Sequence, residues 1–121
     1  MKKRKISLYI EDILNSIAAI ESYLVGITQE QFEDNKMVTD AVIRNFEIIG
    51  EAAKYISEEI RFKFPNIPWG NMVALRNIVI HNYLGVDLDI IYEIATKDFP
   101  SVKNELQSCF DLLINLENQS N

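Results

Sequence analysis

Apolar residues recur along the chain at alternating intervals of three and four positions, which is the spacing of one face of an α-helix. The first such stripe predicts a helix over residues 4–25, and Gly26 would end it in a left-handed turn. The stripe consists of Ile6, Ile10, Ile13, Ile17, Ile20 and Leu24. Thr28 and Gln31 then have the spacing of a capping box, which predicts a short helical turn through Phe32.

A second long stripe predicts one continuous helix from about Val42 to Phe64, the residue that precedes Pro65. Its apolar members are Val42, Phe46, Ile49, Ala53, Ile56 and Ile60. Gly50 lies inside this stripe, where it weakens a helix by about 1 kcal/mol relative to Ala. A glycine at such a position favours close approach by another helix.

The rest of the chain predicts three further helices. Pro68 suits the first turn of a third helix that should stop near Gly85, Asp87 is expected to cap a short fourth, and Pro100 opens or enters a fifth. No segment keeps the alternating pattern of a strand. We therefore expect an all-α fold, an antiparallel helical bundle of about four to five helices, with residues 1–121 forming a single domain.

Composition narrows the classes of protein that this chain can be. With 48% hydrophobic and 25% charged residues, the composition is typical of a globular protein and not of a disordered chain or a small disulfide-rich domain. Its single cysteine, Cys109, cannot form an internal disulfide or a thiolate zinc site, and its apolar neighbours favour a buried, inert thiol. No apolar run approaches the roughly 18 residues that span a bilayer, so we expect a cytoplasmic protein without a membrane partner.

Charge limits how this chain can meet nucleic acid. The net charge is −6, and Lys2–Lys5 hold four of the 12 basic residues, so the remainder of the chain is more acidic still. Binding that coats nucleic acid regardless of sequence needs many Lys and Arg contacts to phosphates. Any contact with RNA must therefore be local.

One segment places polar groups where an apolar stripe would otherwise continue, the run from Arg76 to Tyr83. In a regular helix Arg76 and Tyr83 share nearly one face, about 10 Å apart along the axis, with Asn77 and the only histidine, His81, paired beside them. Arginine offers fixed donors for a phosphate, and histidine moves protons near neutral pH. Because His81 stands about 140° around the helix from Arg76, the two converge only by side-chain reach, across a groove edge, or where the helix loosens.

This segment also has a purely structural interpretation, as a surface ion cluster near a helix end. Motifs for phosphate loops, dinucleotides and zinc are absent from the sequence, and no cofactor or metal is expected. The carboxylates of the second predicted helix favour a solvated face over a di-metal site, since no histidines match them from other helices. They are Asp40, Glu47, Glu51, Glu58 and Glu59.

The octet from Arg76 to Tyr83 fits R-x-x-x-x-H-x-Y with a polar residue directly after the arginine, and in this it resembles the HEPN superfamily of ribonucleases. Further stretches in the same order resemble the HepT-like toxin family and cover nearly the whole chain. They are Asp40 to Arg44, Ile48 to Ala52, the approach from Pro65 through Pro68 to Trp69, and Gly85 to Asp87. The chain departs from many relatives in having Asn82, where they have Gly.

The resemblance implies a HEPN-like fold and the toxin of a type VII-like toxin-antitoxin pair, a metal-independent endoribonuclease. It implies Arg76 and His81 as the catalytic pair with Asn77 in support. It also implies a partner, a small nucleotidyltransferase antitoxin of the MNT type, which silences the toxin by AMPylation of Tyr83. Because each chain has one histidine, acid and base roles must be shared with water or a second subunit, which favours a homodimer acting on RNA.

Two alternatives remain beside the ribonuclease. The chain can be a non-catalytic module that presents a nucleotide or substrate to a nucleotidyltransferase, with Arg76 as a phosphate ligand and His81 structural. It can also be a helical dimerisation domain with an incidental motif. A titrating group beside the arginine favours the ribonuclease, since a docking module has no need of one.

Overall fold

Four long helices form an antiparallel bundle in the computed structural model, which describes residues 4–83 and 88–119, and only the backbone of residues 80–83. The long helices are α1 (Ile6–Leu24), α3 (Lys36–Ala53), α5 (Trp69–Tyr83) and α7 (Phe99–Gln119). Shorter elements join them: α2 (Gln29–Asp34), α4 (Glu58–Lys63), α6 (Leu88–Glu93) and a π-helix, η1 (Ile94–Asp98). Those residues include no strand, so the predicted all-α bundle is confirmed.

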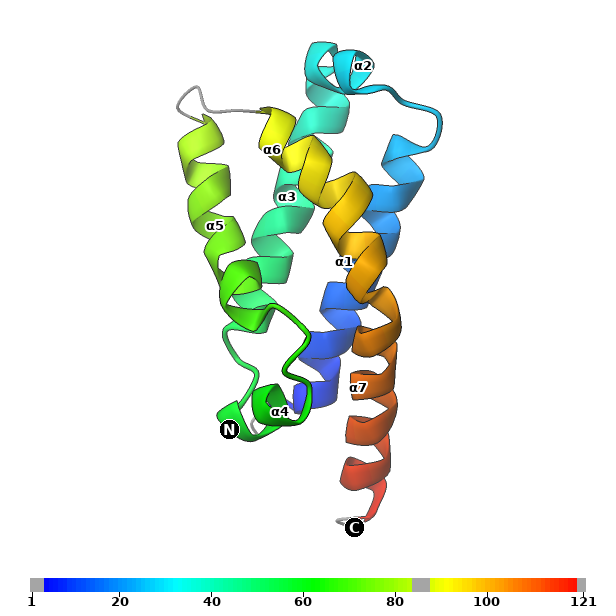
Figure 1. The fold of residues 1–121 in the computed structure, drawn as a ribbon, viewed down its shortest axis with the longest axis vertical. Coiled ribbons are helices and arrows are strands. Elements are labelled where there is room, and N and C mark those ends of the chain that lie inside the picture. The colour runs from blue at the N-terminus through cyan, green and yellow to red at the C-terminus, as the bar shows by residue number, and fades with distance from the viewer. Residues whose placement is uncertain (1–3, 84–87, 120–121) are drawn as a thin grey trace.

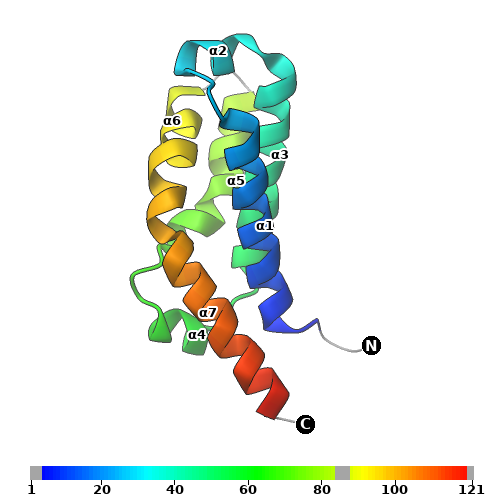
Figure 2. The same ribbon diagram turned by 90° about the vertical axis from the view of Figure 1, so that its right-hand side faces the viewer.

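The long helices enclose one core. Helix α3 lies between α1 and α5, while α7 packs on α1 and brings Phe99 against Phe46 of α3, with ring centroids 5.2 Å apart (Figure 1). The start of α1 and the end of α7 lie at one end of the bundle, and α2 closes the opposite end (Figure 2). Helix α5 thus has α3 as its main neighbour and keeps an outward side free for a site.

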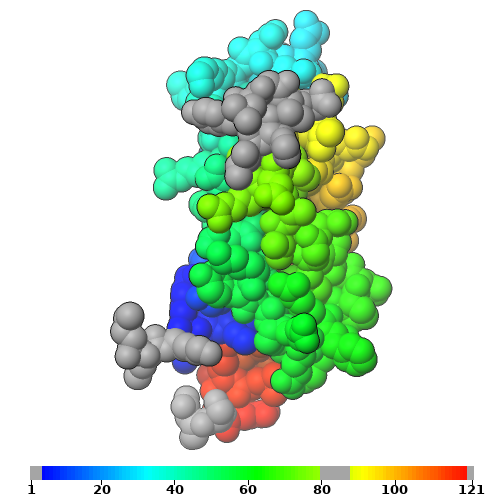
Figure 3. Space-filling model, turned by 90° about the vertical axis from the view of Figure 1, so that its left-hand side faces the viewer, coloured from blue at the N-terminus to red at the C-terminus, as the bar shows by residue number. Residues whose placement is uncertain are grey.

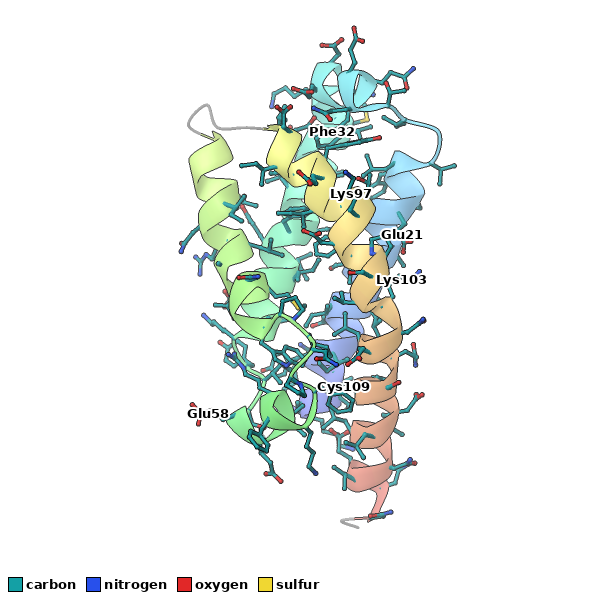
Figure 4. All side chains as sticks on the ribbon, viewed as in Figure 1. Glu21, Phe32, Glu58, Lys97, Lys103 and Cys109 are labelled. Carbon is teal, nitrogen blue, oxygen red and sulfur yellow. The ribbon has the colours of Figure 1, made fainter. Side chains whose placement is uncertain are left out.

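The core comes from the stripes that the sequence predicts. Ile10, Ile13 and Ile17 of α1 are fully buried, as are Phe46 of α3 and Leu106 of α7. At the surface, Glu21 and Lys103 join α1 to α7 through an ion pair of 2.9 Å (Figure 4). No helix within the described residues is long and apolar enough to cross a membrane.

Cys109 is the residue whose expected environment is most plainly confirmed. The side chain is completely buried on α7. Burial disfavours the charged thiolate and raises the pKa of the thiol to about 11. A neutral, inaccessible thiol is unreactive.

The prediction of one continuous helix from Val42 to Phe64 is wrong. Helix α3 begins earlier, where the Asn35 side chain accepts a hydrogen bond from Val38, and it ends at Ala53 before a separate α4. Ser57 has extended backbone angles and caps α4 by accepting from the Ile60 amide. The Arg61 guanidinium donates to the carbonyls of Ala53 and Ile56, each at 3.0 Å, and so satisfies groups that a continuing helix would have used.

The predicted fourth and fifth helices are one helical path rather than two separate elements. Helix α6 passes directly into η1 and then into α7. Pro100, the second residue of α7, has no N–H to donate to the preceding turn, and a wide π-turn directly before it absorbs the missing bond. The predicted stop near Gly85 and the predicted cap Asp87 lie outside the described residues. The capping box of Thr28 and Gln31 at α2 is confirmed.

Candidate functional site

Helix α5 carries the candidate segment, and its first turn is firmly anchored. The Trp69 indole N–H donates to the carbonyl of Phe64 at 3.0 Å, and the Met72 amide donates to that of Pro68 at 2.9 Å. Met72, Leu75 and Val79 point into the core and are at most 3% exposed. This buried side turns Arg76 and Asn77 outward, where both are exposed.

Gly50 of α3 sets the distance between the two helices. A Cβ atom placed there would lie 3.2 Å from the Arg76 amide nitrogen and 3.3 Å from the Met72 carbonyl oxygen. Only glycine therefore allows the backbones to approach this closely without a shift. The predicted close approach is confirmed, and the backbone that it touches is that of Arg76 itself.

Glu51, the residue after Gly50, holds the Arg76 side chain. Its Oε2 accepts from Nη1 of Arg76 at 3.2 Å, and its Oε1 pairs with Nζ of Lys54 at 2.8 Å. The hydrogen bond from Lys54, reinforced by the positive charges of Lys54 and Arg76, lowers the pKa of the Glu51 carboxyl. Glu51 thus stays ionised and bridges two cations on the surface, with 59% of the Arg76 side chain still exposed.

The four predicted site residues lie on one helix. Arg76 and Asn77 are in the described part of α5, and the backbone of His81 and Tyr83 continues the same helix to its end. The side chains of His81 and Tyr83 lie outside the described residues, and with them the predicted convergence on one substrate. Among the residues that the structure does describe, no cluster of three or more His, Cys, Asp or Glu could hold a metal ion.

A groove of about 400 Å³ adjoins Arg76. Helix α3 and the turn after it line it with Arg44, Glu47, Glu51 and Tyr55, while Tyr9 comes from α1. Figure 3 shows this side of the molecule, where α5 in light green, α3 in teal and the blue start of α1 come together.

Sequence reasoning missed most of this groove. The sequence pattern assigns no role of their own to Arg44, Tyr9 and Tyr55, and it predicts Glu47 and Glu51 on a solvated face. The available signal was their spacing, since Arg44, Glu47, Glu51 and Tyr55 follow one another at three and four positions and so share one helix face. The spacing does not show that this face pairs with Arg76, which lies 25 residues beyond Glu51 in the sequence.

The arrangement offers an exposed guanidinium beside a polar groove. Arginine donors in a fixed geometry match the oxygens of a phosphate. The Glu51 contact engages Nη1 of a guanidinium whose side chain is largely exposed, so its other N–H groups can donate to a phosphate while Glu51 holds the arginine. The site is thus suited to a phosphodiester.

Comparison with known proteins gives a consistent result. The model of the family "Ribonuclease HepT-like" matches residues 13–109. The chain is 44% identical over 107 residues to "Putative RNase MJ1380" of Methanocaldococcus jannaschii, covering 88% of this chain and 98% of the relative. It is 39% identical over 105 residues to "Probable ribonuclease HepT" of Thermococcus cleftensis, covering 87% and 96%.

A more distant relative extends the same pattern. "Putative RNase TTE0752" of Caldanaerobacter subterraneus subsp. tengcongensis is 34% identical over 99 residues, covering 82% of this chain and 88% of the relative. No solved structure matches the chain. The matched residues run from α1 into α7 and include all of α5 with Arg76, Asn77, His81 and Tyr83. On the family match and on relatives similar over nearly their full length, the chain belongs to the HepT-like ribonuclease family.

Proposed function

We propose that this chain is a metal-independent endoribonuclease and the toxin of a type VII-like toxin-antitoxin pair, acting in the cytoplasm. The observation that carries the proposal is the exposed Arg76 guanidinium, held by Glu51 at the edge of a groove, on the helix that also bears the only histidine. Membership of a ribonuclease family supports RNA as the phosphodiester.

The proposed reaction uses the RNA as its own nucleophile. A base removes the proton of a 2′-hydroxyl, whose oxygen attacks the adjacent phosphorus, and the bond to the 5′-oxygen breaks as that oxygen takes up a proton. His81 is the proton-transfer residue, and Arg76 stabilises the negative charge that develops on the phosphorane. Asn77, exposed next to Arg76, supports the site as a further hydrogen-bonding group.

One histidine per chain cannot act as base and acid in the same step. The second role falls to water or to His81 of a second copy, so we propose a homodimer in which two α5 helices face one RNA strand. Two Arg76 side chains would then meet in a chain whose net charge is −6, which keeps the contact with RNA local.

The proposed partner is a nucleotidyltransferase antitoxin of the MNT type, which silences the toxin through Tyr83. The Tyr83 hydroxyl attacks the α-phosphorus of ATP, loses its proton and releases pyrophosphate, so that AMP becomes bound to the ring oxygen. The added phosphate carries negative charge, and Tyr83 follows Arg76 by seven positions, close to two full turns of the same helix. It would block RNA by its bulk and compete for the guanidinium.

The test is cleavage of total cellular RNA by the unmodified protein and by Arg76→Ala and His81→Ala variants, in excess chelator. We expect each variant to lose at least about 100-fold in rate, because a positioned acid or base and a donor to the developing charge each contribute that much. Circular dichroism checks that each variant keeps its helices. Lys97→Ala is the control, since Lys97 is exposed on η1, away from the groove (Figure 4). Parental rates in both variants would overturn the assignment and favour the non-catalytic binding module.

A further inference from the structure

We propose that the groove beside Arg76 binds single-stranded RNA, with Tyr55 as a stacking surface for one nucleobase and Arg44 as a phosphate contact. This inference rests on the proposed function, because it names where the RNA lies on either side of the catalytic arginine.

The groove extends in both directions from the catalytic arginine. Arg44, Glu51 and Tyr55 follow one face of α3 and the turn after it, and Glu51 in the middle holds Arg76. At a rise of 1.5 Å per residue, Arg44 lies about 10 Å from Glu51 along α3, and Tyr55 lies beyond the opposite end of the helix, in the turn after Ala53. A phosphate at Arg76 would therefore have one neighbour toward Arg44 and the other toward Tyr55.

Helix direction places Arg44 level with the last turns of α5. Helices α3 and α5 run antiparallel, and Gly50 faces the backbone of Met72 and Arg76 (Figure 1). Six residues earlier on α3, Arg44 stands level with the last turns of α5, which carry His81. A cation there can hold the phosphate that follows the bond being cut.

An aromatic platform lies at the other end. The rings of Tyr9 and Tyr55 stack with centroids 4.8 Å apart and planes at 15°, so Tyr55 is fixed in orientation. The Tyr55 side chain is nevertheless 50% exposed. The guanidinium of Arg4 lies 4.8 Å from the centre of the Tyr9 ring, and the ammonium of Lys54 lies 5.3 Å from that of Tyr55. Rigid aromatic rings set among cations are the usual platform for an unpaired base.

Local charge also favours a strand of phosphates. The groove lining sets Arg4, Arg44 and Arg76 against three carboxylates, so it is balanced in charge on a chain of net charge −6, and Lys54 beside Tyr55 adds one cation at its edge. The three carboxylates are Asp12, Glu47 and Glu51. Arg44 is exposed and makes no ion pair with another described residue, so its guanidinium is available. Glu47 forms no ion pair with another described residue either. Its negative charge is therefore the one in the groove lining that no salt bridge offsets, and it repels the phosphates of RNA.

The experiment measures binding separately from cleavage. The first probe is a short, fluorescein-labelled oligouridylate in which every 2′-hydroxyl is O-methylated, so that it has no nucleophile. The second is an abasic oligomer of equal length and charge. Fluorescence anisotropy gives the dissociation constant of each probe at several salt concentrations.

The variants separate stacking from charge. Tyr55→Ala should weaken binding of the oligouridylate about tenfold and leave the abasic oligomer unchanged, while Tyr55→Phe should bind as the parent does. Arg44→Gln should weaken both probes equally and reduce the slope of log affinity against log salt by about 0.7. Glu47→Gln should strengthen both, and the control Lys97→Gln should change neither.

Two results would overturn the inference. Either Tyr55→Ala keeps the parental preference for the base-bearing probe, or Arg44→Gln keeps the parental affinity and salt slope; a protein partner would then be the better occupant of the groove. The probes report binding whether or not the chain cuts RNA. A chain that binds them as expected but never cleaves RNA would overturn the proposed function and leave the groove assignment standing.

Discussion

Glu51 links the candidate catalytic arginine to the neighbouring helix. Its carboxylate accepts from Arg76 and pairs with Lys54, and Gly50 beside it brings the two backbones together. Because the pKa of the Glu51 carboxyl is lowered, this group stays ionised at neutral and mildly acidic pH and keeps both contacts. Glu51 is therefore a positioning residue, because it touches the arginine and not the reacting atoms.

Glu51→Gln should separate positioning from binding. The amide keeps the shape but loses the charge that orients the guanidinium, so we expect kcat to fall about tenfold. KM should stay level or fall, because a negative charge beside the phosphate site has been removed. Steady-state kinetics on RNA measure both. A rise in KM at constant kcat would contradict the positioning role.

Tyr83 and Tyr92 make a useful pair for testing the modification. The Tyr92 hydroxyl donates to the carbonyl of Ile27 at 2.6 Å and its ring packs against Phe32, so Tyr92 belongs to the scaffold. We expect Tyr83→Phe to remain an active ribonuclease that the nucleotidyltransferase no longer silences. Intact mass after incubation with the partner and ATP reads the outcome. Addition of AMP to Tyr83→Phe would identify another acceptor.

The long helices could be predicted from sequence because each carries its own apolar stripe. The break between α3 and α4 could not, because the stripe continues through Ile56 and Ile60 while the backbone changes direction. The break is stabilised by Ser57, which caps α4, and by Arg61, which donates to the carbonyls left free at the end of α3. Both residue types also occur inside helices, so the sequence does not reveal these roles. The π-turn before Pro100 could not be predicted either, because a proline is compatible both with the start of a helix and with a distortion inside one.

Gly50 and Gly70 test whether the spacing of α3 and α5 matters. Gly50→Ala gains helix propensity but forces its methyl group against α5, and overpacking of this kind costs about 1–3 kcal/mol. We expect a net loss of stability in urea unfolding together with a loss of activity, because the Arg76 backbone must move. Gly70→Ala is the matched control on α5, where an added Cβ would meet nothing within 4 Å. Equal stability of the two variants would show that α5 yields without cost.

The whole chain combines a simple helical scaffold with a candidate site drawn from separate parts of the sequence. The bundle, the buried cysteine and the helix that carries the motif all follow from spacing. The groove does not, because Tyr9, Tyr55 and Arg76 come from three separate parts of the sequence. The proposed sharing of proton transfers between two copies of His81 depends on how two chains assemble and not on the fold of one chain.

The most direct test reads the chemistry of the cut ends. The unmodified protein, with intact mass confirming a free Tyr83, is incubated in excess EDTA with an RNA that it cleaves and with a copy that is 2′-deoxy at the cut position. The account predicts 2′,3′-cyclic phosphate ends from the RNA, dependence on His81, and no cleavage of the deoxy copy. Cleavage of the deoxy copy, or activity that EDTA abolishes, would contradict it.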